Sequence, residues 1–186
     1  GPDFGARFAM LFDTGASYTT LGHSALEQLG IAIDADAPRV LMRTANGEIE
    51  APLVLVDAVW LGEAAVEWVT VAVCDSCASP ESAGLLGLNV SSQFRVALDH
   101  ARHQIELRPL AQPTDRTLDV AQWLDLRSEA RRWWDGRVEV DLVAQNRSQQ
   151  PLERAVVELE CSGDGFAVQI DAVPAAPSWT VPRKTL

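Results

Sequence analysis

Apolar and polar residues alternate over short stretches along residues 3–108, which is the pattern of half-buried β-strands. Asn46-Gly47 stands between two such stretches and is a strong signal for a β-hairpin. Residues 22–29 predict a short helix that ends at Gly30, and Pro52 predicts an edge or a bulge in the strand after the hairpin. The strands predicted by the alternation are residues 6–13, 17–21, 40–45, 49–60, 66–73, 96–98 and 104–107.

The pattern changes beyond residue 108, where prolines and polar residues predict a linker. Residues 119–134 then predict a helix, because Val120, Trp123, Leu124, Ala130 and Trp134 share one broad face at helical spacing. Residues 137–186 alternate again and predict strands only, in a segment short for an independent sandwich. We therefore expect a β domain over residues 3–108, a linker and helix over residues 109–136, and a small all-β domain, complete or truncated, over residues 137–186.

Composition and charge narrow the classes of function. The chain has 186 residues, of which 47% are hydrophobic, and this is enough for a folded core. Its net charge of −11 argues against nucleic-acid binding and against electrostatic docking to an anionic membrane. No apolar stretch reaches the length of about 18 residues that would span a bilayer. Gly1-Pro2 is typical of the scar of a cleaved tag, so an export signal or anchor would lie outside this sequence.

Asp13-Thr14-Gly15 is the sharpest candidate for chemistry. An apolar strand leads directly into Asp13, which places the carboxylate at a strand end, and Gly15 allows another backbone to come close. Taken alone, the tripeptide favours a turn that Asp13 merely caps. A second element favours a catalytic role for Asp13 instead. About seventy residues later, in Gly84-Leu85-Leu86-Gly87-Leu88-Asn89, two apolar residues and a glycine lead straight into a predicted helix that runs through Phe94.

Together these elements resemble the retropepsin-like aspartic proteases of clan AA, and most closely their bacterial members. The resemblance covers roughly residues 5–108 and rests on the order and spacing of the Asp-Thr-Gly strand, a glycine-tipped hairpin and the apolar-apolar-Gly turn before a short helix. It implies a closed β-barrel or β-sandwich with short helices. It also implies an endopeptidase that needs no cofactor and acts on extended segments of protein substrates.

The resemblance assigns roles to individual residues. Asp13 would be the catalytic residue, and Thr14, Gly15, Leu86 and Gly87 would support it. The tip of the hairpin, with Ala45, Asn46 and Gly47, would form a flap over the bound peptide. Because this mechanism needs two carboxylates that share a proton and the chain has one Asp-Thr-Gly, we expect a homodimer that contributes one Asp13 from each copy.

The remaining candidates are weaker. Cys74-x-x-Cys77 and His100-x-x-His103 have spacings found in zinc sites, but the histidines flank the expected turn of a hairpin, so we expect no metal. The two cysteines form either a disulfide or a pair of reduced thiols, and we favour the disulfide. That preference favours an extra-cytoplasmic, periplasmic location, with or without an anchor outside this sequence.

A second hypothesis keeps the fold without the reaction. The long extension after residue 108 would then make the protein a catalytically silent or latent binding module, whose groove or β segment holds a partner protein. Dimerisation separates the two hypotheses, since only the peptidase needs a second copy to complete its site. Neither hypothesis involves nucleic acid or membrane contact by this segment.

Overall fold

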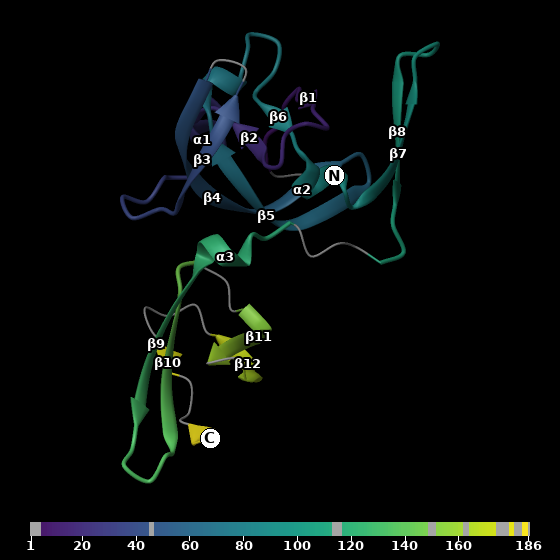
Figure 1. The fold of residues 1–186 in the computed structure, drawn as a ribbon. Helices are drawn as coiled ribbons and strands as arrows, with labels where there is room; N and C mark the ends of the chain where they lie inside the picture. The colour runs from purple at the N-terminus through teal and green to yellow at the C-terminus, as the bar shows by residue number, and fades with distance from the viewer. Residues whose placement is uncertain are drawn as a thin grey trace. The chain divides into compact units, whose positions relative to one another are not determined.

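The fold is described from a computed structural model in which residues 5–44, 47–112, 117–148, 152–161, 164–173, 179–180 and 184–185 are described. Contacts between residues divide the chain into two compact units, Gly1–Asp119 and Val120–Leu186. Figure 1 shows the helices and strands of both units. The predicted domain limits of 3–108, 109–136 and 137–186 stay predictions, although the division after Asp119 lies within the predicted linker.

The main sheet of the first unit has the strand order β2-β5-β4-β3. Its strands are β2 (Thr19–Leu21), β5 (Ala64–Val73), β4 (Gly47–Leu61) and β3 (Arg39–Thr44). β2 pairs with β5 in parallel, and the other pairs are antiparallel. The long strand β4 changes partner at its middle, because β3 pairs with it up to Pro52 and β5 pairs with it from Leu53 onward. Pro52 therefore has a partner strand on one side only, as its missing N–H group predicts.

The core of the first unit is built around β5. Val69, Thr70, Val71 and Ala72 are all completely buried, so both faces of this strand are covered. Helix α1 (His23–Leu29) contributes Ala25 and Leu26 to the same core, and it ends at Gly30, which has a left-handed φ of 69°. This termination is the one that the sequence predicted, since glycine adopts that conformation without steric cost.

Two smaller pairings complete the first unit. β1 (Leu11–Phe12) lies parallel to β6 (Leu85–Leu86), and β7 (Phe94–Asp99) forms a hairpin with β8 (Gln104–Pro109). Between β6 and β7 stands the short helix α2 (Leu88–Ser91). The prediction that this helix runs through Phe94 is wrong, because Phe94 opens β7 and packs into the core.

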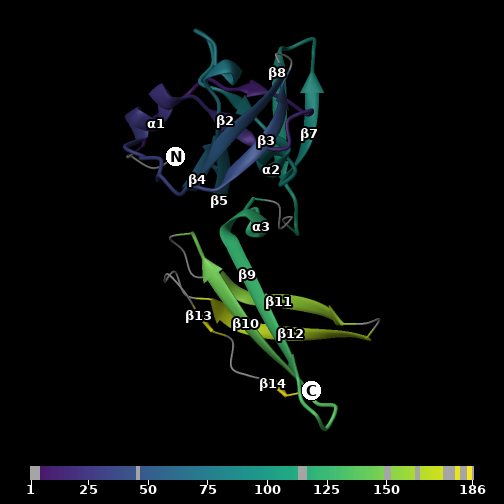
Figure 2. The ribbon, with the colours of Figure 1, turned by 60° about the vertical axis from the view of Figure 1, so that its left-hand side comes forward.

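The second unit corrects the predicted helix at residues 119–134. Only α3 (Val120–Trp123) is helical, and the chain continues as β9 (Leu124–Arg132). β9 pairs in register with β10 (Val138–Asn146) along its whole length (Figure 2). Leu124 and Leu126 also fit a two-residue period, so the local pattern suited a strand as well as a helix, and the distant partner β10 decided between them. Trp134, expected on the apolar face of that helix, is 95% exposed in the turn between the two strands.

The other elements that are described in the second unit are strands, as predicted. β11 (Leu152–Cys161) and β12 (Asp164–Val173) form an antiparallel hairpin. β13 (Trp179–Thr180) and β14 (Lys184–Thr185) pair with β10. The mostly β class is therefore confirmed for both units, and the sheets that the described strands form are open rather than closed. Among the described residues, no helix has the length and apolar character required to cross a membrane.

The start of helix α1 depends on a carboxylate from a distant segment. The N-cap residue Gly22 has no side chain, and Asp75 Oδ1, from the 3-10 turn η1 (Asp75–Cys77), accepts a hydrogen bond from the backbone N–H of His23 at 2.8 Å. Asp75 Oδ2 lies 2.8 Å from His23 Nδ1. The backbone hydrogen bond lowers the pKa of Asp75 most, the side chain of His23 lowers it further, and burial opposes both.

We expect Asp75→Ala to lower the free energy of unfolding at neutral pH by about 0.5–1 kcal/mol, a small value because the pair is largely exposed. Since the pKa is lowered in the folded state, this stabilisation is present above the unfolded pKa of about 3.9 and is lost as the pH falls through the folded pKa. Urea unfolding at several pH values measures the effect. His23→Ala keeps the backbone N–H and should cost less; equal losses in the two variants would contradict the capping role.

Candidate active site

Asp13 lies where two parallel strands end together. Its backbone N–H donates to the carbonyl of Leu86 at 3.1 Å, which continues the ladder in which Phe12 pairs with Leu86. Leu86 is buried in the core, whereas Asp13 is half-buried. The core therefore fixes the backbone of Asp13, and its carboxyl group stands at the edge of the fold.

The turn after Asp13 holds the carboxylate itself. The backbone N–H of Gly15 donates to Asp13 Oδ1 at 2.8 Å. A Cβ atom at Gly15 would lie 3.2 Å from the same oxygen, so a larger residue would press on the carboxylate. The predicted support from Gly15 thus has a direct geometric form, a hydrogen bond from its main chain to the side chain that it follows.

A buried carboxamide braces the loop from behind. Asn89 Oδ1 accepts hydrogen bonds from the backbone N–H of Thr19 at 2.8 Å and from the hydroxyl of Thr19 at 2.9 Å. Asn89 Nδ2 donates to the carbonyl of Thr70 at 2.7 Å, and the hydroxyl of Thr19 accepts from the N–H of Gly87 at 3.2 Å. Because these groups are buried and each has a partner, the network fixes one arrangement of the three segments.

The β6–α2 turn presses directly against the segment that follows the loop. The N–H groups of Leu88 and Asn89 donate to the carbonyls of Ala16 and Ser17 at 2.8 and 3.2 Å. A Cβ atom at Gly87 would lie 2.4 Å from the carbonyl carbon of Tyr18, a distance that no side chain can occupy. Glycine at this position is therefore required by the close approach of two backbones.

The other predicted residues are placed as follows. Thr14 is exposed beside Asp13. Gly47 is exposed at the start of β4 with a φ of 117°, and its carbonyl accepts a hydrogen bond from the hydroxyl of Thr44 at 2.9 Å. Ala45 and Asn46, the expected tip of the flap, lie outside the described residues. The structure thus brings Asp13, Gly15, Leu86 and Gly87 together, and the roles of these residues, like that of Gly47, stay predictions.

The predicted cysteine and histidine candidates lie elsewhere in the first unit. A disulfide joins Cys74 to Cys77. His100 and His103 lie in the turn of the β7–β8 hairpin, as expected. Within the described ranges, no three side chains of His, Cys, Asp or Glu gather as metal ligands.

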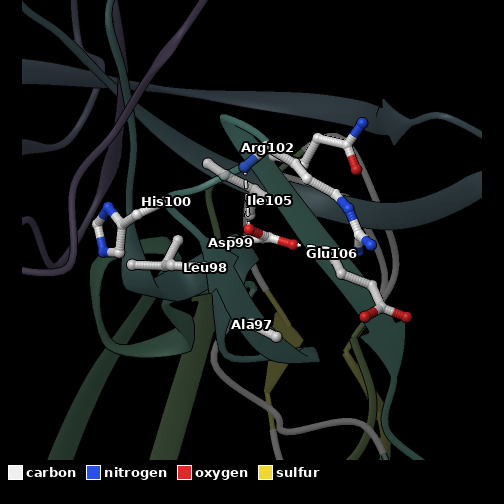
Figure 3. A pocket seen from close by; sticks show the side chains of 8 residues that line it. Ala97, Leu98, Asp99, His100, Arg102, Ile105 and Glu106 are labelled. Carbon is white, nitrogen blue, oxygen red and sulfur yellow. Dashed lines mark hydrogen bonds and ion pairs between the residues drawn. The ribbon is translucent and has the colours of Figure 1, made fainter.

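A surface hollow lies on the same β7–β8 hairpin (Figure 3). Leu98, His100 and Ile105 line it, and Asp99 holds Arg102 across the turn, with Arg102 N donating to Asp99 Oδ1 at 3.0 Å. None of the residues that hold Asp13 lines this hollow. It is therefore separate from the site built around Asp13.

Sequence reasoning missed the residues that brace the loop from behind. Thr19, Thr70 and Asn89 are polar residues buried at distant points of the chain, and no spacing pattern links them. For Thr19 the only local signal was the run Thr19-Thr20 inside a short predicted strand, where apolar residues are more usual, and Asn89 stood in the second motif without an assigned role. Such a run indicates that buried hydroxyl groups have partners without indicating which ones.

The comparisons with known proteins agree with this geometry. Residues 4–90 match the model of the family described as aspartyl protease. This part of the chain, which contains the Asp13 loop, α1, the β3–β4 hairpin and the β6–α2 turn, therefore belongs to the retropepsin-like aspartyl proteases. No curated protein and no solved structure matches the chain significantly.

The close approach at Gly87 yields a test of the loop support. We expect Gly87→Ala to destabilise the first unit by about 3 kcal/mol or more, since its new methyl group would meet backbone atoms that cannot rotate away. Gly15→Ala meets only a side-chain oxygen and should leave the thermal unfolding midpoint nearly unchanged. Thermal unfolding followed by circular dichroism compares the variants, and a Gly87→Ala protein as stable as the wild type would show that the two backbones are not in close contact.

Proposed function

We propose that this protein is an aspartic endopeptidase that works as a homodimer, with one Asp13 from each chain. The observation that carries the proposal is the placement of Asp13, whose carboxylate stands at a strand end and is held by Gly15 N–H in a domain of the aspartyl protease family. A protease-type function follows from the family alone. The pairing of chains and the role of each residue are the proposed part.

The proposed reaction uses the two carboxylates in different protonation states. Two such groups close together cannot both ionise easily, so one keeps its proton and the other is charged. The charged carboxylate takes a proton from water as that water attacks the scissile carbonyl, and the protonated carboxyl group donates a hydrogen bond to the carbonyl oxygen. The collapse of the tetrahedral intermediate then breaks the C–N bond, and a proton passes to the leaving amine.

The surface around Asp13 supports a second copy as the partner. Thr14 and Gly15 are exposed, and Leu11, which leads into the motif, is 59% exposed although it belongs to a strand. An apolar residue at such a position is typical of a surface that another chain covers. A second copy related by a two-fold axis would cover this surface and bring the two Asp13 side chains together.

The β3–β4 hairpin is the proposed cover for the substrate. β3 pairs with β4 up to Thr44 and Gly47, so the end of this hairpin is held to the sheet by one strand pair only. Closure of such a hairpin over an extended peptide would exclude water other than the attacking one. The Cys74–Cys77 disulfide supports work in an oxidising compartment.

Asp13→Asn tests the catalytic role. The amide cannot take a proton from water, so we expect peptidase activity to fall by at least about 1,000-fold, of the order seen when essential groups of other proteases are removed. The fold should persist, because Asn can still accept the hydrogen bond from Gly15. Cleavage of an unfolded protein substrate, measured by mass spectrometry, reports the activity. Asp99→Asn, which changes a carboxylate on the β7–β8 turn, serves as the matched control.

Mixing the wild type with Asp13→Asn tests whether the site is shared. If each active unit needs two intact copies, an equal mixture at fixed total concentration retains about a quarter of the activity once the chains have exchanged. Independent chains would retain about half. Activity of about half, together with sedimentation as a monomer, would reject the dimeric site; a folded monomer without any activity would favour the binding module instead.

A further inference from the structure

The short segment of residues 117–119, the last of the first unit, is fastened to the buried strand β5. The backbone N–H of Thr70 donates to the carbonyl of Thr117 at 2.9 Å, and the backbone N–H of Asp119 donates to the hydroxyl of Thr70 at 3.1 Å. Thr70 is completely buried. Because two hydrogen bonds to one buried residue hold it, this segment belongs to the fold of the first unit and is not a free linker.

The same segment reaches the active-site loop through one side chain. The hydroxyl of Tyr18 donates to Asp119 Oδ2, across a separation of 101 residues in the sequence. Tyr18 is half-buried and stands between Ser17 and Thr19. Burial raises the pKa of Tyr18 well above its usual range, and the hydrogen bond and charge of Asp119 raise it further.

Thr70 joins this contact to the brace already described. Its carbonyl accepts the hydrogen bond from Asn89 Nδ2, while its N–H and hydroxyl hold residues 117–119. The segment after Gly15 is thus held at two adjacent points, at Tyr18 by Asp119 and at Thr19 by Asn89. Both supports meet at one residue of β5.

We propose that Asp119 is a positioning residue, which acts through Tyr18 to hold the loop that carries Asp13. The inference rests on the proposed function, because it is the proposed role of Asp13 that makes this loop catalytic. It extends the working protease beyond the family match at residues 4–90 to Asp119. The chain passes into the second unit at the next residue, so a change in the path of the chain at this junction would be transmitted to the loop.

The contact between the two side chains is tested first, without any measurement of activity. Tyr18 is the only tyrosine of the chain, so the pH dependence of tyrosinate absorbance in the full-length protein reports Tyr18 alone. We expect it to ionise above the usual pKa of about 10, and we expect Asp119→Ala to lower that pKa because the acceptor and its negative charge are removed. Asp99→Ala is the control. An identical titration in wild type, Asp119→Ala and Asp99→Ala, with the fold retained by circular dichroism, would overturn the contact.

The positioning role is tested next by hydrogen exchange and kinetics in the full chain. We expect Tyr18→Phe and Asp119→Ala to speed the exchange of backbone amides in residues 13–19 and to lower kcat by about 10-fold to 100-fold with KM little changed. Asp119→Asn keeps an oxygen acceptor and should restore most of the slow amide exchange and most of kcat. Asp99→Ala should resemble the wild type in both measurements. If Asp119→Ala does not fold, Tyr18→Phe, which keeps the ring, decides the matter.

The outcomes separate this inference from the proposed function. If the wild type has no peptidase activity and the variants exchange their loop amides faster than the wild type does, the peptidase is rejected and the positioning role of Asp119 is supported. An active wild type whose Tyr18→Phe and Asp119→Ala variants keep both loop exchange and kcat would reject the brace and leave the peptidase intact. A rise in KM with unchanged kcat would also overturn it, because Tyr18 would then act in substrate binding.

Discussion

The arrangement of the site depends on the hydrogen bonds of the Asn89 carboxamide. It accepts hydrogen bonds from Thr19 and donates one to the carbonyl of Thr70, so it joins the segment after the Asp13 loop, the β6–α2 turn and the central strand β5. A buried amide whose oxygen and nitrogen both have hydrogen-bond partners allows little freedom, since a shift would leave a polar group unpaired in the interior. The glycine at position 87 serves the same end, because it lets the turn lie directly against the backbone of Tyr18.

These hydrogen bonds explain how Asp13 can be held in place while its carboxylate stays accessible. The backbone of Asp13 continues the β1–β6 ladder, whose residue Leu86 is buried, and the carboxylate is held by Gly15 N–H at an exposed turn. A single chain thus presents a prearranged carboxylate next to exposed Thr14 and Leu11. In the proposed reaction, the second carboxylate comes to that place from a second copy of the chain.

The compact unit that contains Asp13 extends beyond the residues that match the family. Residues 4–90 carry the family pattern, yet the hairpin β7–β8 and residues 117–119 are part of the same compact unit. The hydrogen bonds of Thr70 with Thr117 and Asp119 show why, since they satisfy polar groups on the buried part of strand β5. The end of the first unit is therefore fastened to the part of the fold that holds the Asp13 loop.

Much of this fold could be predicted from the sequence because its signals are local. Gly30 ends a helix, β3 pairs with β4 as the hairpin signal predicted, and the apolar run before Asp13 places a carboxylate at a strand end, each for reasons contained in a few neighbouring residues. The helix predicted over residues 119–134 failed because the same residues suited a strand, and only pairing with β10 decided between the two. The contacts of Asn89 with Thr70 and of Tyr18 with Asp119 could not be predicted, since hydrogen bonds between distant polar side chains leave no periodic trace. The sequence by itself determined which residue is the candidate for the chemistry and where the chain turns. Only the tertiary structure decided what holds that residue in place, because packing selects the partner of each buried polar group.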